Sequence, residues 1–150
     1  MEPMDDPDIR EWVTAVDGDV DYLDFLAQRV GIAEWSAIAR VFLPRFVEVG
    51  DCVLWDRVYE PGNFAQWQTE LPGNPTAVEA VLNQFRLWQY LDLDSDFDAQ
   101  ATALAEDIAF CWRGALARQF PAREFEVSVL ATEDGPVVRC TTIRPVPSGP

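Results

Sequence analysis

Carboxylates are the main chemistry-bearing side chains of this sequence, and they gather at two places. Aspartates alternate with other residues over 17–21 and again over 92–98. Such spacing opens the loops that bind Ca²⁺, and paired carboxylates can also hold Mg²⁺ or transfer protons. Both stretches fail as calcium loops, because the sixth position holds Tyr22 or Phe97 instead of glycine and the twelfth position lacks glutamate. The helix dipole, which favours acids at a helix N-terminus, is the simpler explanation.

The sequence contains neither histidine nor lysine, and all eleven of its basic residues are arginine. This composition excludes the Ser-His-Asp triad, the Cys-His pair, the H-E-x-x-H zinc site and the lysine Schiff base. No glycine-rich nucleotide-binding motif occurs either. We therefore expect a protein that is not an enzyme and holds no cofactor or metal. An enzyme or metal-binding domain built on the aspartates is the alternative.

The three cysteines, Cys52, Cys111 and Cys140, offer little further chemistry. They are odd in number, far apart and in no paired spacing, which argues against both a disulfide framework and a zinc site. All three have apolar neighbours in the sequence. They are predicted to be buried, reduced thiols.

The net charge of −15 is concentrated in two segments of the chain. Residues 1–24 carry nine acids against one arginine, and residues 92–98 carry four acids and no base. Such acidity argues against nucleic-acid and anionic membrane partners, and it favours fast association with a basic protein. The sequence has no signal-peptide pattern and no run of 18 apolar residues, which predicts a cytoplasmic location.

Three helices are predicted before residue 45. The first opens at Asp6 and Pro7, an N-cap followed by proline at the first helical position. The second is expected to be capped by Asp19 and to end at Gly31. The third begins near Ala33, and apolar residues at three- and four-residue spacing predict that one of its faces lies in the core.

The middle of the chain predicts a hairpin followed by two helices. The β-prone runs 46–49 and 52–55 flank a Gly-Asp pair that is typical of a tight turn. The long connection 59–75 can hold a short helix over 64–71, with Asn63 as its N-cap.

A clearer helix starts at Pro75, and its apolar stripe is predicted to continue to Leu91. Another long helix is predicted from Ser95, closed by Pro121. A second hairpin, which turns at residues 133–135, ends the folded chain.

These elements predict an α+β fold. We expect an antiparallel sheet of about four strands, formed by two hairpins near 46–58 and 124–144 and packed on one side by four to five helices. Residues 1–144 would form a single domain, with residues 1–5 loose and residues 145–150 a disordered proline-rich tail.

The predicted site is an acidic face with aromatic anchors. The face requires that the two acidic segments be neighbours in the fold, and two separate solvated segments are the alternative. Aromatic residues in a long connection are candidate interface anchors, although Trp67 could equally lie half-buried under the loop. The candidate partner-binding residues are Asp17, Asp19, Asp21, Asp24, Asp92, Asp94, Asp96, Tyr59 and Trp67.

The preferred functional hypothesis is a non-catalytic, acidic protein-binding domain. By analogy of charge and size, it resembles small immunity or inhibitor proteins that neutralise a basic partner such as a bacterial toxin. An aspartate-based, metal-dependent enzyme is one alternative. A housekeeping or secretion-chaperone-like domain is another.

Overall fold

The computed structural model describes residues 1–93 and 98–146, and the chain divides into two compact units, one of residues 1–41 and one that begins at Phe42. Within the described residues the fold is α+β, with six α-helices and five antiparallel strands, which confirms the predicted class. None of these described helices has the length and apolar composition needed to cross a membrane. The predicted helix start at Ser95 and the tail over 147–150 lie outside the described residues.

The first unit consists of short helices. Its α-helices are α1 (Pro7–Ala15), α2 (Tyr22–Ala27) and α3 (Ile32–Phe42), preceded by a turn of 3₁₀-helix over Pro3–Asp5. As predicted, Asp6 caps α1, and its Oδ1 accepts hydrogen bonds from the next free backbone N–H groups.

The cap of α2 is Asp21, so the prediction of Asp19 was wrong. Asp21 Oδ1 accepts from the Leu23 backbone N at 2.7 Å, and Asp24 Oδ2 accepts from the Asp21 backbone N at 3.0 Å. These reciprocal bonds form a capping box. Gly31 does not end this helix either, because α2 ends at Ala27.

The second unit holds all five strands. Its helices are α4 (Pro61–Glu70), α5 (Pro75–Leu82) and α6 (Asp98–Gln119), with 3₁₀ turns over Asp56–Val58 and Leu87–Gln89. Its strands are β1 (Phe46–Val49), β2 (Cys52–Trp55), β3 (Gln84–Arg86), β4 (Phe125–Thr132) and β5 (Gly135–Thr142). Both predicted hairpins are confirmed. The first turns at Gly50, whose φ of +57° is a backbone conformation that suits glycine.

Strand β3 replaces the second half of a predicted helix. The apolar stripe suggested a helix through Leu91, but α5 ends at Leu82 and the chain then pairs with β5, placing Phe85 opposite Val138. Phe85 packs edge-on against Trp55, with ring centroids 6.0 Å apart. Tertiary packing of this ring therefore outweighs the helical periodicity.

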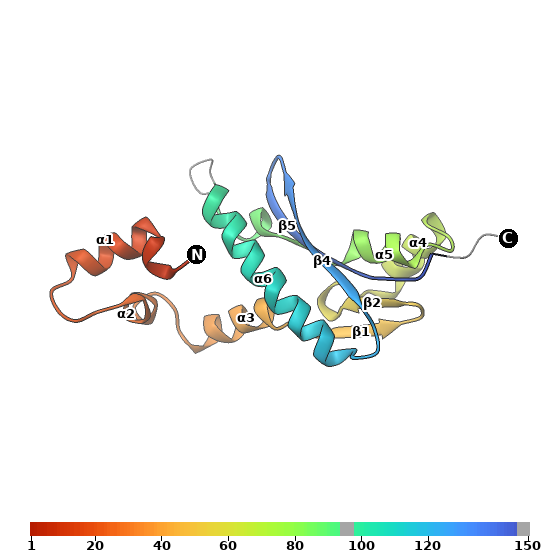
Figure 1. Ribbon diagram of the computed structural model, residues 1–150, viewed down its shortest axis with the longest axis horizontal. Coiled ribbons are helices and arrows are strands. Elements are labelled where there is room, and N and C mark those ends of the chain that lie inside the picture. Colours follow the sequence, from red (N-terminus) through yellow and green to blue (C-terminus); the bar gives the residue numbers. More distant parts are fainter. Residues whose placement is uncertain (94–97, 147–150) are drawn as a thin grey trace. The chain divides into compact units, whose positions relative to one another are not determined.

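The strands form two sheets where the sequence suggested one. One sheet is β1-β2, and the other has the order β3-β5-β4. Helix α6 packs across β4 and β5, as Figure 1 shows. Its fully buried Trp112 meets Phe46 and Trp55 edge-on, at 5.6 and 5.1 Å between centroids. This aromatic cluster packs residues of β1 and β2 against the helix that also covers β4 and β5.

A buried carboxylate on α5 lies between the two sheets. Glu79 is fully buried and accepts from the Val53 backbone N of β2 at 2.8 Å. It also accepts from the backbone N and the hydroxyl of Thr142 in β5, at 2.7 and 2.8 Å. The Arg144 guanidinium completes the set with two bonds of 2.8 and 2.9 Å.

Asn83 repeats this arrangement one helical turn further on. Its Oδ1 accepts from the Trp55 backbone N at 2.9 Å, and its Nδ2 donates to the carbonyls of Val53 and Cys140 at 2.8 and 3.3 Å. Glu79 and Asn83 thus lie between β2 and β5, and their side chains form hydrogen bonds to backbone groups of both strands. Their hydrogen bonds satisfy backbone groups that would otherwise be buried without partners.

We predict that Glu79→Gln destabilises the protein strongly. The substitution leaves Arg144 without its carboxylate and points a side-chain amide donor at backbone donors. Removing one partner of a buried ion pair generally costs about 3–5 kcal/mol. Urea denaturation should show a loss of unfolding free energy of this size.

Glu48→Gln is the matched control, because Glu48 pairs with Arg123 at 2.9 Å while both side chains are partly exposed to solvent. Exposed pairs contribute about 0–1 kcal/mol. Equal, small losses in the two variants would contradict the structural role assigned to Glu79.

Candidate functional site

Four of the predicted site residues lie together in the first unit. Asp17 and Asp19 are exposed in the loop between α1 and α2, and Asp21 and Asp24 are exposed at the start of α2. The capping box holds the last two carboxylates in place. The chain therefore presents a short, ordered acidic segment, Asp17–Asp24, to solvent.

The first unit has no buried residue, although the structure describes all of residues 1–41. Its best-defined packing is an aromatic pair, Trp12 edge-on to Phe25 at 5.7 Å, with the Arg29 guanidinium 3.8 Å from the Phe25 ring centroid. This segment carries ten acidic residues against three arginines. Its side chains contribute mainly to surface.

Helix α3 exposes the apolar face that the sequence predicted to be core. Ile32 is 83% exposed and Trp35 is 41% exposed, and Ile38 belongs to the same exposed stripe. Sequence periodicity correctly indicated one apolar face on this helix, but periodicity does not say whether that face is covered. Trp35 is therefore a candidate contact residue that the sequence-based prediction missed.

The other predicted acids belong to the second unit. Asp92 is exposed, after the 3₁₀ turn that follows β3. Asp94 and Asp96 lie outside the described residues.

The two predicted aromatic anchors differ in their surroundings. Tyr59 is exposed and touches Phe64 edge-on, with the centroids 5.9 Å apart. Trp67 is half-buried and packs against the apolar cluster that contains Leu54 and Phe64. The structure thus presents Tyr59 to solvent, whereas Trp67, on α4, is partly covered by that apolar cluster.

Glu60 fixes the start of α4, the helix that carries Trp67. Its two carboxylate oxygens accept from the backbone N atoms of Gly62 and Asn63, at 3.0 and 2.6 Å. The predicted helix is real, but its cap is Glu60 and not Asn63. These backbone donors, Asn63 first, hold the pKa of the Glu60 carboxyl below its usual value.

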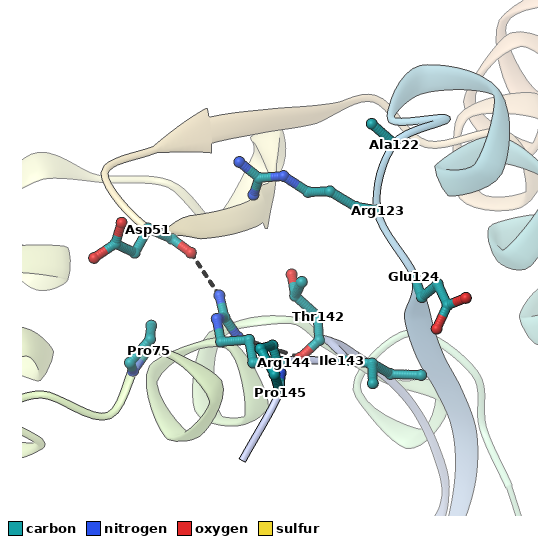
Figure 2. A pocket seen from close by; sticks show the side chains of 9 residues that line it. All are labelled: Asp51, Pro75, Ala122, Arg123, Glu124, Thr142, Ile143, Arg144 and Pro145. Atoms are coloured by element: carbon teal, nitrogen blue, oxygen red, sulfur yellow. Dashed lines mark hydrogen bonds between the residues drawn. The ribbon is translucent and has the colours of Figure 1, made fainter. Parts of the chain in front are cut away.

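A hollow of about 620 Å³ lies where the end of β5 meets the segment after α6. Figure 2 shows that Arg123 and Arg144 reach into it, while the Glu124 side chain points away from them. Both guanidinium groups already have carboxylate partners, Glu48 and Glu79. Glu79 also holds the pKa of Arg144 above its usual value. This hollow is therefore not a site of free positive charge.

Two of the three cysteines are not activated as nucleophiles. Cys52 and Cys140 are buried and Cys111 is half-buried, and all three are free thiols. Burial, together with the negative charge of Glu79, raises the pKa of Cys52 to about 11 and also raises that of Cys140. Both thiols are therefore protonated at neutral pH, whereas the thiolate is the reactive form.

Within residues 1–93 and 98–146, no group of three or more His, Cys, Asp or Glu side chains is placed to hold a metal ion.

Comparisons with protein families, curated proteins and solved structures find no match to this chain.

We predict that Glu60→Gln removes a pH-dependent contribution to stability. The folded pKa of Glu60 lies below the unfolded value of about 4.3. Its contribution is therefore present above about pH 4.3 and is lost as the pH falls through the folded pKa. The gap in unfolding free energy between wild type and variant should close as the solution is acidified.

Glu70→Gln is the control for this experiment. It removes one charge from the other end of α4, where a carboxylate is unfavourable to the helix dipole and accepts from the Gln66 side chain instead of from backbone N–H groups. A gap that closes in the same way for both variants would argue against the cap as its cause.

Proposed function

We propose that this protein is a non-catalytic binding domain that captures a basic protein partner through residues 1–41. The proposal rests on the exposed surface of that segment. None of its residues is buried, its carboxylates are mostly exposed, and an apolar helix face stands exposed among them. Interfaces commonly combine an apolar centre with a polar, charged rim.

The acidic segment Asp17–Asp24 and the α3 stripe have different tasks in this proposal. The carboxylates attract the partner over a distance and speed its approach. Trp35 and Ile38 supply apolar area that is removed from water on contact, and tryptophan is enriched among residues that dominate binding energy. Tyr59 is a further exposed anchor on the second unit.

An inhibitor or immunity protein is the particular function that we favour. A small acidic protein can cover the positively charged cleft of a toxin, and mutual charge then makes capture fast. We propose that this takes place in the cytoplasm. The net charge of −15 supports capture of a basic partner. The three free cysteines support the cytoplasmic location, because disulfides are rare in the cytosol.

The test starts from the partner that co-purifies with the chain from its native host. We predict that a variant with asparagine at Asp17, Asp19, Asp21 and Asp24 associates with that partner at least about tenfold more slowly, because charge steering changes association rates by 10–10³. Asparagine keeps the capping oxygen at Asp21, so the helix should persist. Surface plasmon resonance measures the rate.

A charge-matched control neutralises four exposed acids elsewhere, at Asp51, Asp56, Glu70 and Glu124. Its association rate should fall much less, because a local field and not the total charge steers the partner. Equal losses in the two variants would show that the segment 17–24 has no special role.

A further inference from the structure

Strand β4 is the outer edge of the three-stranded sheet. In β5, the Cys140 backbone N donates to the Asn83 carbonyl, on the side away from β4. Its register partner, Val127, must therefore also direct its backbone groups away from β5. The two-residue period of a strand gives Val129 and Ala131 the same outward direction.

One arginine side chain already forms a hydrogen bond to this edge of the sheet. The Arg113 side chain of α6 donates to the outward carbonyl of Val127 at 2.9 Å. In the described part of the chain, the outward groups of Val129 and Ala131 have no hydrogen-bonding partner. The last third of β4 thus offers an open row of donors and acceptors, which is a template for another strand.

A hollow of about 410 Å³ lies beside this open edge, lined by residues of α6 and of the β4–β5 hairpin. Val129, Ala131 and Pro136 line it with apolar surface. Its charged lining residues are Glu106 from α6 and the turn residues Glu133 and Asp134, all exposed. The hollow therefore joins an apolar floor to a negative rim.

From this geometry we infer that the β4 edge over Val129–Ala131 binds an extended, arginine-bearing segment of the basic partner by strand addition. The inference rests on the proposed function and names the part of the partner that is recognised. Backbone hydrogen bonds hold the added strand, and alternate side chains face the hollow. An arginine there lies close to the three carboxylates, which favour its charge.

Charge also disfavours a second copy of this chain at the same edge. Pairing two β4 strands would bring Glu126, Glu133 and Asp134 of each copy close to the acids of the other. Like charges facing one another across strands are destabilising. A basic segment instead brings charges opposite to those of these acids, which favours its binding.

The probe is a capped synthetic heptapeptide in which valine and arginine alternate. We expect saturable changes in the amide NMR signals of Val129 and Ala131 when the peptide is added to the full chain. The same peptide with N-methyl groups on alternate residues keeps its charge but cannot pair along one edge. It should bind at least about tenfold more weakly, since each tenfold loss corresponds to about 1.4 kcal/mol, the scale of one or two hydrogen bonds.

Two protein variants test the two parts of the site. Ala131→Pro removes an outward N–H without removing a bond to β5, because the backbone N–H of Ala131 points away from β5. A triple variant, Glu106→Gln, Glu133→Gln and Asp134→Asn, removes the rim charge. Ala131→Pro should weaken peptide binding by about fivefold, because it removes one hydrogen bond worth about 1 kcal/mol. The triple variant should weaken it by between about fivefold and about 150-fold, because each of the three exposed carboxylates contributes up to about 1 kcal/mol. The variant at Asp51, Asp56, Glu70 and Glu124 is the control.

Equal binding of the plain and N-methylated peptides, or signal changes away from β4, would overturn the strand-addition site. So would unchanged binding to Ala131→Pro. These outcomes leave the proposed function untouched if the native partner still loses its fast association when residues 17–24 are neutralised. If neutralising residues 17–24 leaves the association rate unchanged while the peptide still binds at β4, the role assigned to residues 1–41 is wrong.

Discussion

The fold of the second unit depends on the buried carboxylate of Glu79. Five hydrogen bonds reach it from β2, from β5 and from Arg144, so one side chain satisfies backbone donors on two separate sheets. A two-stranded sheet such as β1-β2 is marginal alone, and it gains stability when it packs against further structure. Asn83, one turn on, repeats the bridge. Because a buried charge is costly unless every lone pair is used, the completeness of this network is what permits a carboxylate there.

Three arginines of the second unit are engaged in structural contacts. Arg144 and Arg123 are held by Glu79 and Glu48, and Arg113 donates to a carbonyl of β4. These guanidinium groups serve the architecture, so they contribute little free positive potential to the surface. The acids of residues 1–24 are mostly exposed and have one arginine among them. The arginines of the second unit are engaged in structural contacts, whereas the carboxylates of the first unit are exposed. Both features favour attraction of a basic partner.

Local signals in the sequence were sufficient for some elements. Asp6-Pro7 indicated the start of α1, and Gly50-Asp51 indicated the first hairpin, because caps and tight turns depend on neighbouring residues alone. Asp19 and Asp21 are both good caps by type, so only the backbone path decided between them. Strand β3 was missed because Phe85 fits a helical stripe as well as a strand. Glu79 stood beside apolar residues at a core-facing position, but its partner Arg144 is 65 residues away in the chain. The uncovered face of α3 was equally beyond a periodicity argument, because burial depends on what packs against a helix.

We propose that long-range charge attraction drives recognition of a basic partner. The most direct measurement is the association rate constant of the chain with its co-purified partner as a function of ionic strength, from about 0.01 M to 0.5 M salt, a range over which the screening length falls from about 30 Å to a few ångströms. We predict a steep fall in the association rate constant while the dissociation rate constant changes much less. An association rate constant that does not change over this range would contradict it.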